Sequence, residues 1–412
     1  MKNLLNQQTI ESIKKEGIPV IIFGARIVGE ALFYACNKAG IKVECFCDNN
    51  INETKSSKCG IEVIHTSDLK KKYEDAIFLI SAADIKDVVD QLHGLGYFKW
   101  HPCSLLLRDF NIYQHQFSAP MDFVQYGIDT CLLCHDSYLT PDKLFLRSVD
   151  IIITERCSLK CRDCSNLTQY YKDPKDCDIK KLIGSIDAFC NIMDEVNEFR
   201  VIGGEPLMNK ESHLIIKRLI NEPKVKRVVI YTNGTIVPRE EQIEYLKHKK
   251  VLFIITDYGQ LSRNLSTLTQ KLSSNNISFY VGKVQRWTNC AKIGRHYRDA
   301  KGQKEIFKNC CAKNTFTISD GKLYRCPFAA NAARLQAVPE FKDDYINFLQ
   351  EFQKDINVPE IKKKIRRFLL KKEFLKTCDF CNGRSFEDPY ITPAIQTKKP
   401  LEYKQYGNQK SN

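Results

Sequence analysis

The chain has 412 residues, 43% of them hydrophobic and 27% charged, which is enough apolar material for two or three packed domains. Its net charge of +14 is spread along the chain without interleaved aromatic side chains, so we expect no nucleic-acid partner. No apolar run reaches the length of a membrane span and the first residues contain no export segment, so we predict a cytoplasmic protein with no membrane partner. Eighteen cysteines in that reducing compartment indicate metal or cluster binding rather than disulfides.

Residues 1–120 are predicted to form a small doubly wound, Rossmann-like parallel sheet, because short apolar runs alternate with helical patterns. Strands are expected at 18–23, 42–47, 61–64 and 76–80, and helices at 30–39 and 85–95. The turn from Gly24 to Gly29 is a degraded phosphate-binding fingerprint, since Arg26 stands where a second glycine is usual. Asp48 ends the second strand, in place for a ribose hydroxyl. The domain therefore either binds a nucleotide or nucleotide-sugar or has a purely structural role.

A connector at 121–147 follows. Within it, Cys131, Cys134 and His135 spell a c-type haem attachment motif. That attachment takes place outside the cytoplasm, so we interpret the match as coincidence.

Residues 148–308 repeat a strand–helix rhythm that is typical of a parallel barrel or partial barrel. Strands are expected at 149–154, 199–202, 227–231, 251–255 and 277–281, with a helix near 179–196. Functional loops should open at the carboxyl ends of these strands.

The loop after the first of these strands carries Cys157, Cys161 and Cys164 in the spacing C-x3-C-x2-C. Three thiolates in one short loop can hold three corners of a [4Fe–4S] cube and leave the fourth iron open to another ligand. Zinc sites normally close with four protein ligands, so the spacing favours iron and sulfide.

Three further strand ends carry polar or glycine residues. Gly203, Gly204, Glu205 and Pro206 follow the second barrel strand; the glycines allow close approach to the backbone, and the carboxylate can accept from a cationic group. Asn233 and Asp257 end the next two strands, where they are either ligand contacts or turn residues.

Residues 309–412 are predicted to be an irregular, cysteine-rich extension with a hairpin around Asp320-Gly321. Four cysteines there offer enough thiolates to close a second cluster: Cys311, Cys326, Cys378 and Cys381. Cys310 is an alternative to Cys311, and Cys290 is either a stray ligand or a catalytic thiol. A structural zinc site with the same four sulfurs is the alternative interpretation.

The cysteine loop together with Gly203–Pro206 resembles the signature of the radical S-adenosylmethionine (radical SAM) enzymes, over roughly residues 148 to 385. The resemblance implies a partial (β/α)6 barrel. It also implies a cluster on the three cysteines whose open iron is chelated by SAM, and SAM contacts at Gly203–Pro206, Asn233 and Asp257. The C-terminal cysteines resemble the SPASM/twitch extension, and since no cysteines follow Cys381, a twitch-like domain with one auxiliary [4Fe–4S] cluster is the better match. One residue departs from the family pattern: Asp163 precedes the third cysteine, where the family commonly has an aromatic residue near adenine.

The activity that the resemblance implies is reductive cleavage of SAM to a 5′-deoxyadenosyl radical, which abstracts hydrogen from a substrate carbon. The N-terminal domain looks like those attached to sugar-modifying enzymes, so we expect a small-molecule substrate, a nucleotide-linked sugar of surface-glycan biosynthesis. A flavodoxin- or ferredoxin-type reductant is expected as partner. The alternatives are a peptide or protein maturase and a non-enzymatic iron–sulfur redox protein.

Overall fold

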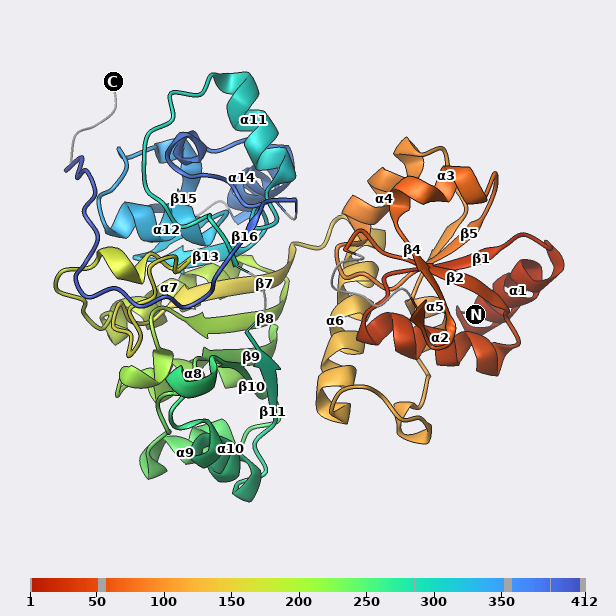
Figure 1. The fold of residues 1–412 in the computed structure, drawn as a ribbon, viewed down its shortest axis with the longest axis horizontal. Coiled ribbons are helices and arrows are strands. Elements are labelled where there is room, and N and C mark those ends of the chain that lie inside the picture. The colour runs from red at the N-terminus through yellow and green to blue at the C-terminus, as the bar shows by residue number, and fades with distance from the viewer. Residues whose placement is uncertain (1, 51–56, 285–286, 352–357, 386, 408–412) are drawn as a thin grey trace. The chain divides into compact units, whose positions relative to one another are not determined.

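The computed structural model describes residues 2–50, 57–284, 287–351, 358–385 and 387–407 (Figure 1). The chain divides into two compact units, residues 1–143 and 144–412. Among the described residues, no helix is long and apolar enough to cross a membrane.

The first unit is a six-stranded sheet in the order β3-β4-β2-β1-β5-β6, with every neighbouring pair parallel except β3 and β4. Its strands are β1 (Val20–Phe23), β2 (Val43–Cys47), β3 (Ser57–Lys58), β4 (Ile61–Ile64), β5 (Ile77–Ile80) and β6 (Trp100–Pro102). Its helices are α1 (Lys2–Lys15), α2 (Ile27–Ala39), α3 (Leu69–Lys72), α4 (Ile85–Gly94), α5 (Ser104–Leu107) and α6 (Met121–Leu139). The strand order reverses between β1 and β5, which is the point where doubly wound folds hold ligands.

Both faces of this sheet are buried, because successive side chains of a strand point to opposite sides. Ile22 packs in a core with α2, whereas Ile21 packs in another with α4. The segment expected to be a connector is mostly the helix α6, whose Val124 and Ile128 join the first of these cores. The doubly wound sheet expected from the sequence is confirmed.

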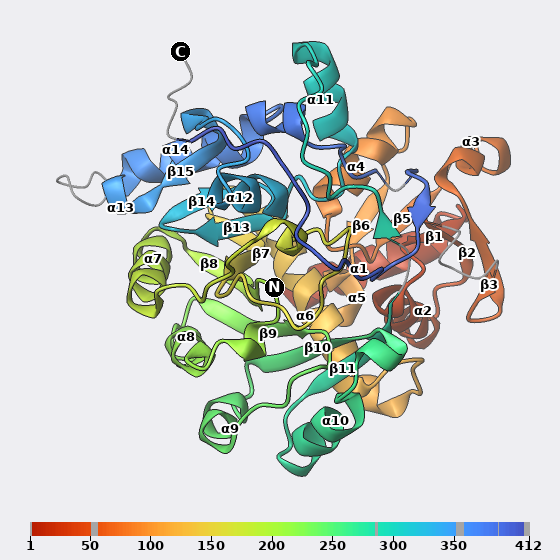
Figure 2. The same ribbon diagram turned by 60° about the vertical axis from the view of Figure 1, so that its left-hand side comes forward.

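The second unit is built on an eight-stranded sheet in the order β11-β10-β9-β8-β7-β13-β14-β15. Its strands are β7 (Phe145–Ile152), β8 (Glu195–Ile202), β9 (Val225–Thr232), β10 (Val251–Asp257), β11 (Phe279–Lys283), β13 (Phe316–Ser319), β14 (Lys322–Tyr324) and β15 (Tyr345–Asn347). β7 to β11 are parallel and follow one another across the sheet, with helices α7 (Ile179–Ile192), α8 (Ser212–Ile220), α9 (Glu240–Leu246) and α10 (Leu265–Ser274) in the connections (Figure 2). This is the expected partial barrel.

A sixth parallel strand completes the barrel sheet from the far end of the chain. β13 pairs in parallel with β7 rather than with β11, and it turns at Asp320-Gly321 into β14, as the sequence predicted. Both turn residues have positive φ, 49° and 76°, which fits the twist of a tight hairpin. The sheet therefore runs across the boundary expected at residue 308. The same unit also contains the helices α11 (Ala300–Asn309), α12 (Pro327–Arg334), α13 (Phe348–Glu351) and α14 (Val358–Lys371) and the short strands β12 (Trp287–Thr288) and β16 (Tyr390–Ile391).

The helix expected near 179–196 ends earlier than the sequence indicated. α7 ends at Ile192, and β8 begins at Glu195. Asp194 lies between them and accepts a hydrogen bond from the Leu144 backbone N–H at 2.8 Å, while Val196 pairs with β7. Residues 195–196, whose local pattern also suits a helix, are therefore in a strand because they pair with β7.

Candidate functional site

The loop that leaves β7 gathers its three cysteines against a small apolar cluster. Cys161 is buried and Cys157 and Cys164 are half-buried, packed with the residues Leu159, Tyr258, Leu261, Trp287 and Ala394. Burial raises the pKa of Cys157 and, to about 11, that of Cys161, and the neighbouring Cys164 adds to both shifts. Thiolates here are costly without a nearby cation, and a bound metal would supply the compensating charge.

Gly203 and Gly204 bring the end of β8 against the cysteine loop. The Gly204 N–H donates to the Thr154 carbonyl at 2.9 Å, and the Glu205 N–H donates to the Arg156 carbonyl at 2.8 Å. A Cβ at Gly204 would lie 2.1 Å from the Arg156 carbonyl oxygen and 2.9 Å from the Cys157 Cβ. The glycines are thus required for close approach, and the backbone that comes close is the base of the cysteine loop.

Glu205 is 1% exposed, and its carboxylate is held by the chain itself. It accepts from the Leu207 N–H at 3.2 Å, the Thr232 hydroxyl at 2.9 Å and the Asn233 N–H at 2.9 Å. Burial raises the pKa of Glu205 to about 7, although these three hydrogen bonds oppose the shift. Its carboxylate therefore fastens the end of β8 to the end of β9.

Asn233 lies against the cysteine loop, whereas Asp257 does not reach it by any described hydrogen bond. The Asn233 side-chain amide is 3.6 Å from the Cys157 sulfur and 3.3 Å from the Ser158 hydroxyl. Its carbonyl oxygen accepts from the Thr235 N–H at 3.0 Å. Asp257 accepts from the Gly259 N–H at 2.8 Å, which is an Asx turn. Both residues make turn contacts, and Asn233 in addition touches a candidate cluster ligand.

A C-terminal segment that no sequence motif marked lines the same loop. The Gln396 side chain donates to the Cys161 sulfur at 3.2 Å and accepts from the Lys160 N–H at 2.7 Å. Backbone hydrogen bonds of 2.7 Å on either side join Arg162 to Ile395 and Thr397 to Lys160. Residues 394–397 therefore form one wall of the cysteine site. Asp163, the residue that departs from the family pattern, is buried beside Arg162, whose Nε donates to it at 2.9 Å.

The second group of cysteines surrounds a cavity of about 50 Å³. Five thiols line it: Cys290, Cys310, Cys326, Cys378 and Cys381. Cys311, the ligand expected from the sequence, is exposed and is absent from the lining, and its neighbour Cys310 faces the cavity instead. Ser165, which follows the last cysteine of the first site, also lines this cavity, so the two cysteine groups are adjacent.

Within the described ranges, no three His, Cys, Asp or Glu side chains are close enough to share a single metal ion. This does not argue against clusters, because each thiolate of a [4Fe–4S] cube binds its own iron.

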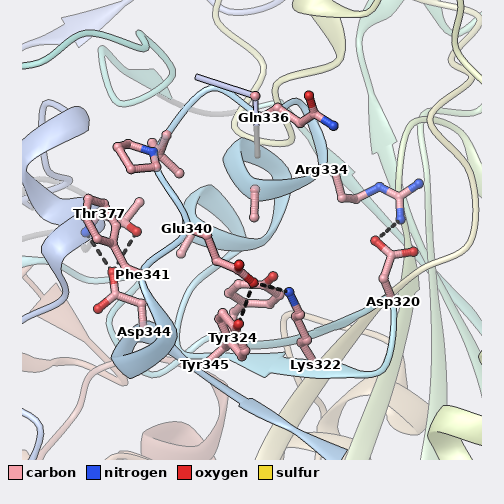
Figure 3. A pocket seen from close by; sticks show the side chains of 15 residues that line it. Asp320, Lys322, Tyr324, Arg334, Gln336, Glu340, Phe341, Asp344, Tyr345 and Thr377 are labelled. Atoms are coloured by element: carbon pink, nitrogen blue, oxygen red, sulfur yellow. Dashed lines mark hydrogen bonds and ion pairs between the residues drawn. The ribbon is translucent and has the colours of Figure 1, made fainter. Parts of the chain in front are cut away.

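The Cys378-x2-Cys381 turn is anchored from one side by Asp344, which is 2% exposed. Its carboxylate accepts from the Thr377 N–H and hydroxyl, both at 2.7 Å (Figure 3). It also accepts from the Lys376 N–H at 3.0 Å. Figure 3 shows the neighbouring cavity of about 190 Å³, whose charged side chains pair among themselves, Arg334 with Asp320 and Lys322 with Glu340. No cysteine lines that cavity.

In the first unit, the candidate nucleotide contact Asp48 accepts hydrogen bonds from backbone N–H groups of the chain. The Asp48 carboxylate accepts from the Ala25 N–H and from the Asn50 N–H, both at 2.9 Å. A Cβ at Gly29 would lie 2.0 Å from the Gly24 carbonyl oxygen, so this glycine serves close packing of α2 on β1. Asp48 thus ties the end of β2 to the turn after β1.

The apparent haem motif is part of the core of the first unit. Cys131 donates to the Ser81 carbonyl at 3.3 Å. His135 is fully buried, with Nδ1 3.2 Å from the Cys103 N–H and Nε2 2.8 Å from the Ala82 carbonyl. Burial lowers the pKa of His135, and these contacts fix a neutral ring that binds α6 to the loop after β5.

Comparison with known proteins gives one family match: residues 151–257 match the model of the Radical SAM superfamily. A GTP 3′,8-cyclase of Clostridium acetobutylicum is 29% identical over 97 residues, 23% of this chain and 30% of the relative. One of Alkaliphilus metalliredigens is 33% identical over 100 residues, 23% of this chain and 31% of the relative. The chain thus spans less than a third of the length of these curated relatives.

Similarity to solved structures is lower. BtrN in complex with AdoMet and 2-DOIA is 16% identical with a TM-score of 0.35, covering 63% of this chain and 98% of that chain. SuiB of Streptococcus suis bound to S-adenosylmethionine is 12% identical with a TM-score of 0.30, covering 68% of this chain and 80% of that chain.

Proposed function

Residues 151–257 form a radical SAM domain, and from that premise we propose that this protein is a radical SAM enzyme with a small-molecule substrate. The observation that carries the proposal is the packing of Cys157, Cys161 and Cys164 in one loop. The base of this loop lies directly against Gly203 and Gly204. The donor set fits a cluster, because three soft thiols are present. A Cβ at Gly203 or Gly204 would collide with the backbone of Thr154 or Arg156, at the base of the loop that carries these thiols.

A [4Fe–4S] cluster with SAM supplies reductive cleavage of SAM to methionine and a 5′-deoxyadenosyl radical. The chain's own residues hold and shield that chemistry. The three cysteines would each bind one iron, and Asn233 and Gln396 would donate to two of their sulfurs. Tyr258 and Trp287 pack beside the cysteines and would exclude water from the reacting groups.

For the second cysteine group, an auxiliary [4Fe–4S] cluster on Cys310, Cys326, Cys378 and Cys381 is the assignment that the cavity supports. Cys310 replaces the sequence-based choice of Cys311 because only Cys310 lines the cavity. Cys290 then lies at the same cavity as an additional thiol.

The first test is anaerobic reconstitution, with iron content and 5′-deoxyadenosine measured together after addition of SAM and a strong reductant. We expect about eight irons per chain and slow SAM cleavage, which Cys157→Ala abolishes. Cys177→Ala is the matched control, because Cys177 is a half-buried cysteine of the same unit outside both groups. Iron binding without any SAM cleavage, also in the presence of candidate substrates, would instead assign a redox role.

We further propose a nucleotide-linked sugar as the substrate class. The strand order of the first unit, with Gly24 and Asp48 beside its reversal point, supports it. In the full-length protein, UDP- or GDP-sugars should raise the melting temperature and stimulate 5′-deoxyadenosine formation, and Asp48→Ala should remove the binding. Stimulation by a peptide and not by nucleotide-sugars would favour a maturase. A flavodoxin- or ferredoxin-type protein is the proposed reductant.

A further inference from the structure

Arg298 contacts the Cys378-x2-Cys381 turn with both its backbone and its side chain. Its guanidinium Nη1 donates to the carbonyl oxygens of Cys378 and Cys381, at 3.0 Å each. Its backbone N–H donates to the Asp379 carboxylate at 2.7 Å. One residue therefore fixes the first and last members of the turn and the residue after the first cysteine.

The segment that carries Arg298 is itself held against the turn. The His296 N–H donates to the Asp379 carbonyl at 2.9 Å, and the Gly294 N–H donates to the Phe380 carbonyl at 3.1 Å. The Gln303 side chain donates to the Arg298 carbonyl at 3.0 Å. Arg298 is thus positioned by contacts on both sides along the chain, so its guanidinium needs little reorganisation to stay on the two cysteine carbonyls.

Arg298 and Asp344 hold the same turn through different backbone groups. Asp344 holds the N–H groups that enter the turn, and Arg298 holds the carbonyl groups within it and at its exit. A positive charge beside two cysteine ligands stabilises the additional negative charge that a cluster carries when it is reduced. Because the single nitrogen Nη1 donates to both carbonyls, it also ties the two cysteines to each other and limits the spacing of their sulfurs.

We propose that Arg298 is a positioning residue for the auxiliary cysteine site: it fixes the Cys378–Cys381 turn for cluster binding and raises the reduction potential of the bound cluster. This inference rests on the auxiliary cluster of the proposed function.

The test uses the full chain with Cys157, Cys161 and Cys164 changed to alanine, so that only the auxiliary site can hold a cluster. In this background, Arg298→Met, Arg298→Lys and Arg295→Met are compared. Arg295 is the matched control, since it is half-exposed and reaches the other Asp379 oxygen only at 3.5 Å. The readouts are iron and sulfide per chain, the rate of iron loss to a chelator, the midpoint potential by EPR-monitored titration, and the melting temperature of the apo form.

Arg298→Met is expected to lose iron about tenfold faster or more and to shift the midpoint to a more negative potential. Arg298→Lys should restore the potential more than the iron retention, because lysine keeps the positive charge but its flexible stem and rotatable ammonium hold the two carbonyls less firmly. Arg295→Met should have the same rate of iron loss and the same midpoint potential as the triple-alanine background protein. Unchanged potential and retention in a folded Arg298→Met overturn this inference alone. A background protein that binds no iron before Arg298 is changed overturns the auxiliary cluster, and the inference with it.

Discussion

The side-chain amide of Gln396 donates a hydrogen bond to the sulfur of Cys161 over 3.2 Å, although 235 positions separate the two residues. The contact is not isolated, because Cys161 and Gln396 also form an antiparallel bridge between their backbones. The C-terminal segment is therefore an integral part of the cysteine site rather than a tail beyond it.

Replacing Gln396 with leucine should lower the midpoint potential of the cluster on Cys157, Cys161 and Cys164 and slow SAM cleavage. A hydrogen bond to a charged acceptor contributes about 1.5–3 kcal/mol, and here it stabilises the more negative, reduced state. EPR-monitored titration measures the effect. Gln405→Leu is the control, since Gln405 lies further toward the C-terminus and donates to the Tyr403 hydroxyl, away from the cysteine loop. Equal potentials in both variants would contradict a role for the Gln396 contact.

Gly204→Ala should destabilise the fold by about 2–3 kcal/mol or more and prevent assembly of the first cluster. The new Cβ would meet backbone, the Arg156 carbonyl oxygen at 2.1 Å, so the base of the cysteine loop must move. Gly184→Ala is the opposite case: its Cβ meets nothing within 4 Å inside α7, and it should stabilise by about 0.5–1 kcal/mol. Chemical denaturation and iron content measure both. A Gly204→Ala protein with normal stability and normal iron would show that the loop has room to adapt.

The buried carboxyl of Glu205 should make the apo protein less stable as pH rises from about 4.5 to 7. Burial raises the pKa of Glu205 from 4.5 to about 7 in the folded state, so the folded protein binds more protons than the unfolded chain in this window. The free energy of unfolding is then highest below pH 4.5 and falls by roughly 3 kcal/mol from this group as pH passes through 7.

The difference in unfolding free energy between the wild type and Glu205→Gln, measured across this range, isolates that contribution. It should decline with pH and level off above 7. Glu211→Gln, at an exposed glutamate of the following loop, is the matched control for the substitution itself. A pH-independent difference for Glu205→Gln would mean that the carboxyl ionises at its ordinary pKa in the folded protein.

Changing Cys310 to serine should remove the auxiliary cluster, so that iron falls from about eight to about four per chain, while Cys311→Ser should keep it. The physical reason is access, because Cys310 lines the cavity with Cys326, Cys378 and Cys381 and Cys311 is exposed. The two variants make the same sulfur-to-oxygen change at neighbouring positions, so each is the control for the other. The reverse pattern would restore the assignment made from sequence.

Local sequence was sufficient for features whose cause is local. Short apolar runs predicted β1, β2, β4 and β5 of the first sheet and β7 to β11 of the second, but not β3, β6 or β15. The positive φ of Asp320 and Gly321 is what the predicted tight hairpin demands. The spacing of Cys157, Cys161 and Cys164 likewise predicted a single loop at the end of β7, and the structure places them there. Where two local patterns competed, as at residues 193–196, pairing with β7 decided the outcome.

Contacts between segments far apart in the chain could not be predicted from the sequence. Spacing could not choose between Cys310 and Cys311, because adjacent residues point in different directions and only the packing around the cavity selects one. Nothing in the local pattern placed Gln396 on Cys161, Arg298 on the Cys378–Cys381 turn, or β13 beside β7. The sequence by itself determined which residues can bind a cluster, since that depends on side-chain chemistry. The tertiary structure alone decided which of them meet and what holds them there, because long-range pairing brings together residues whose separation along the chain carries no signal.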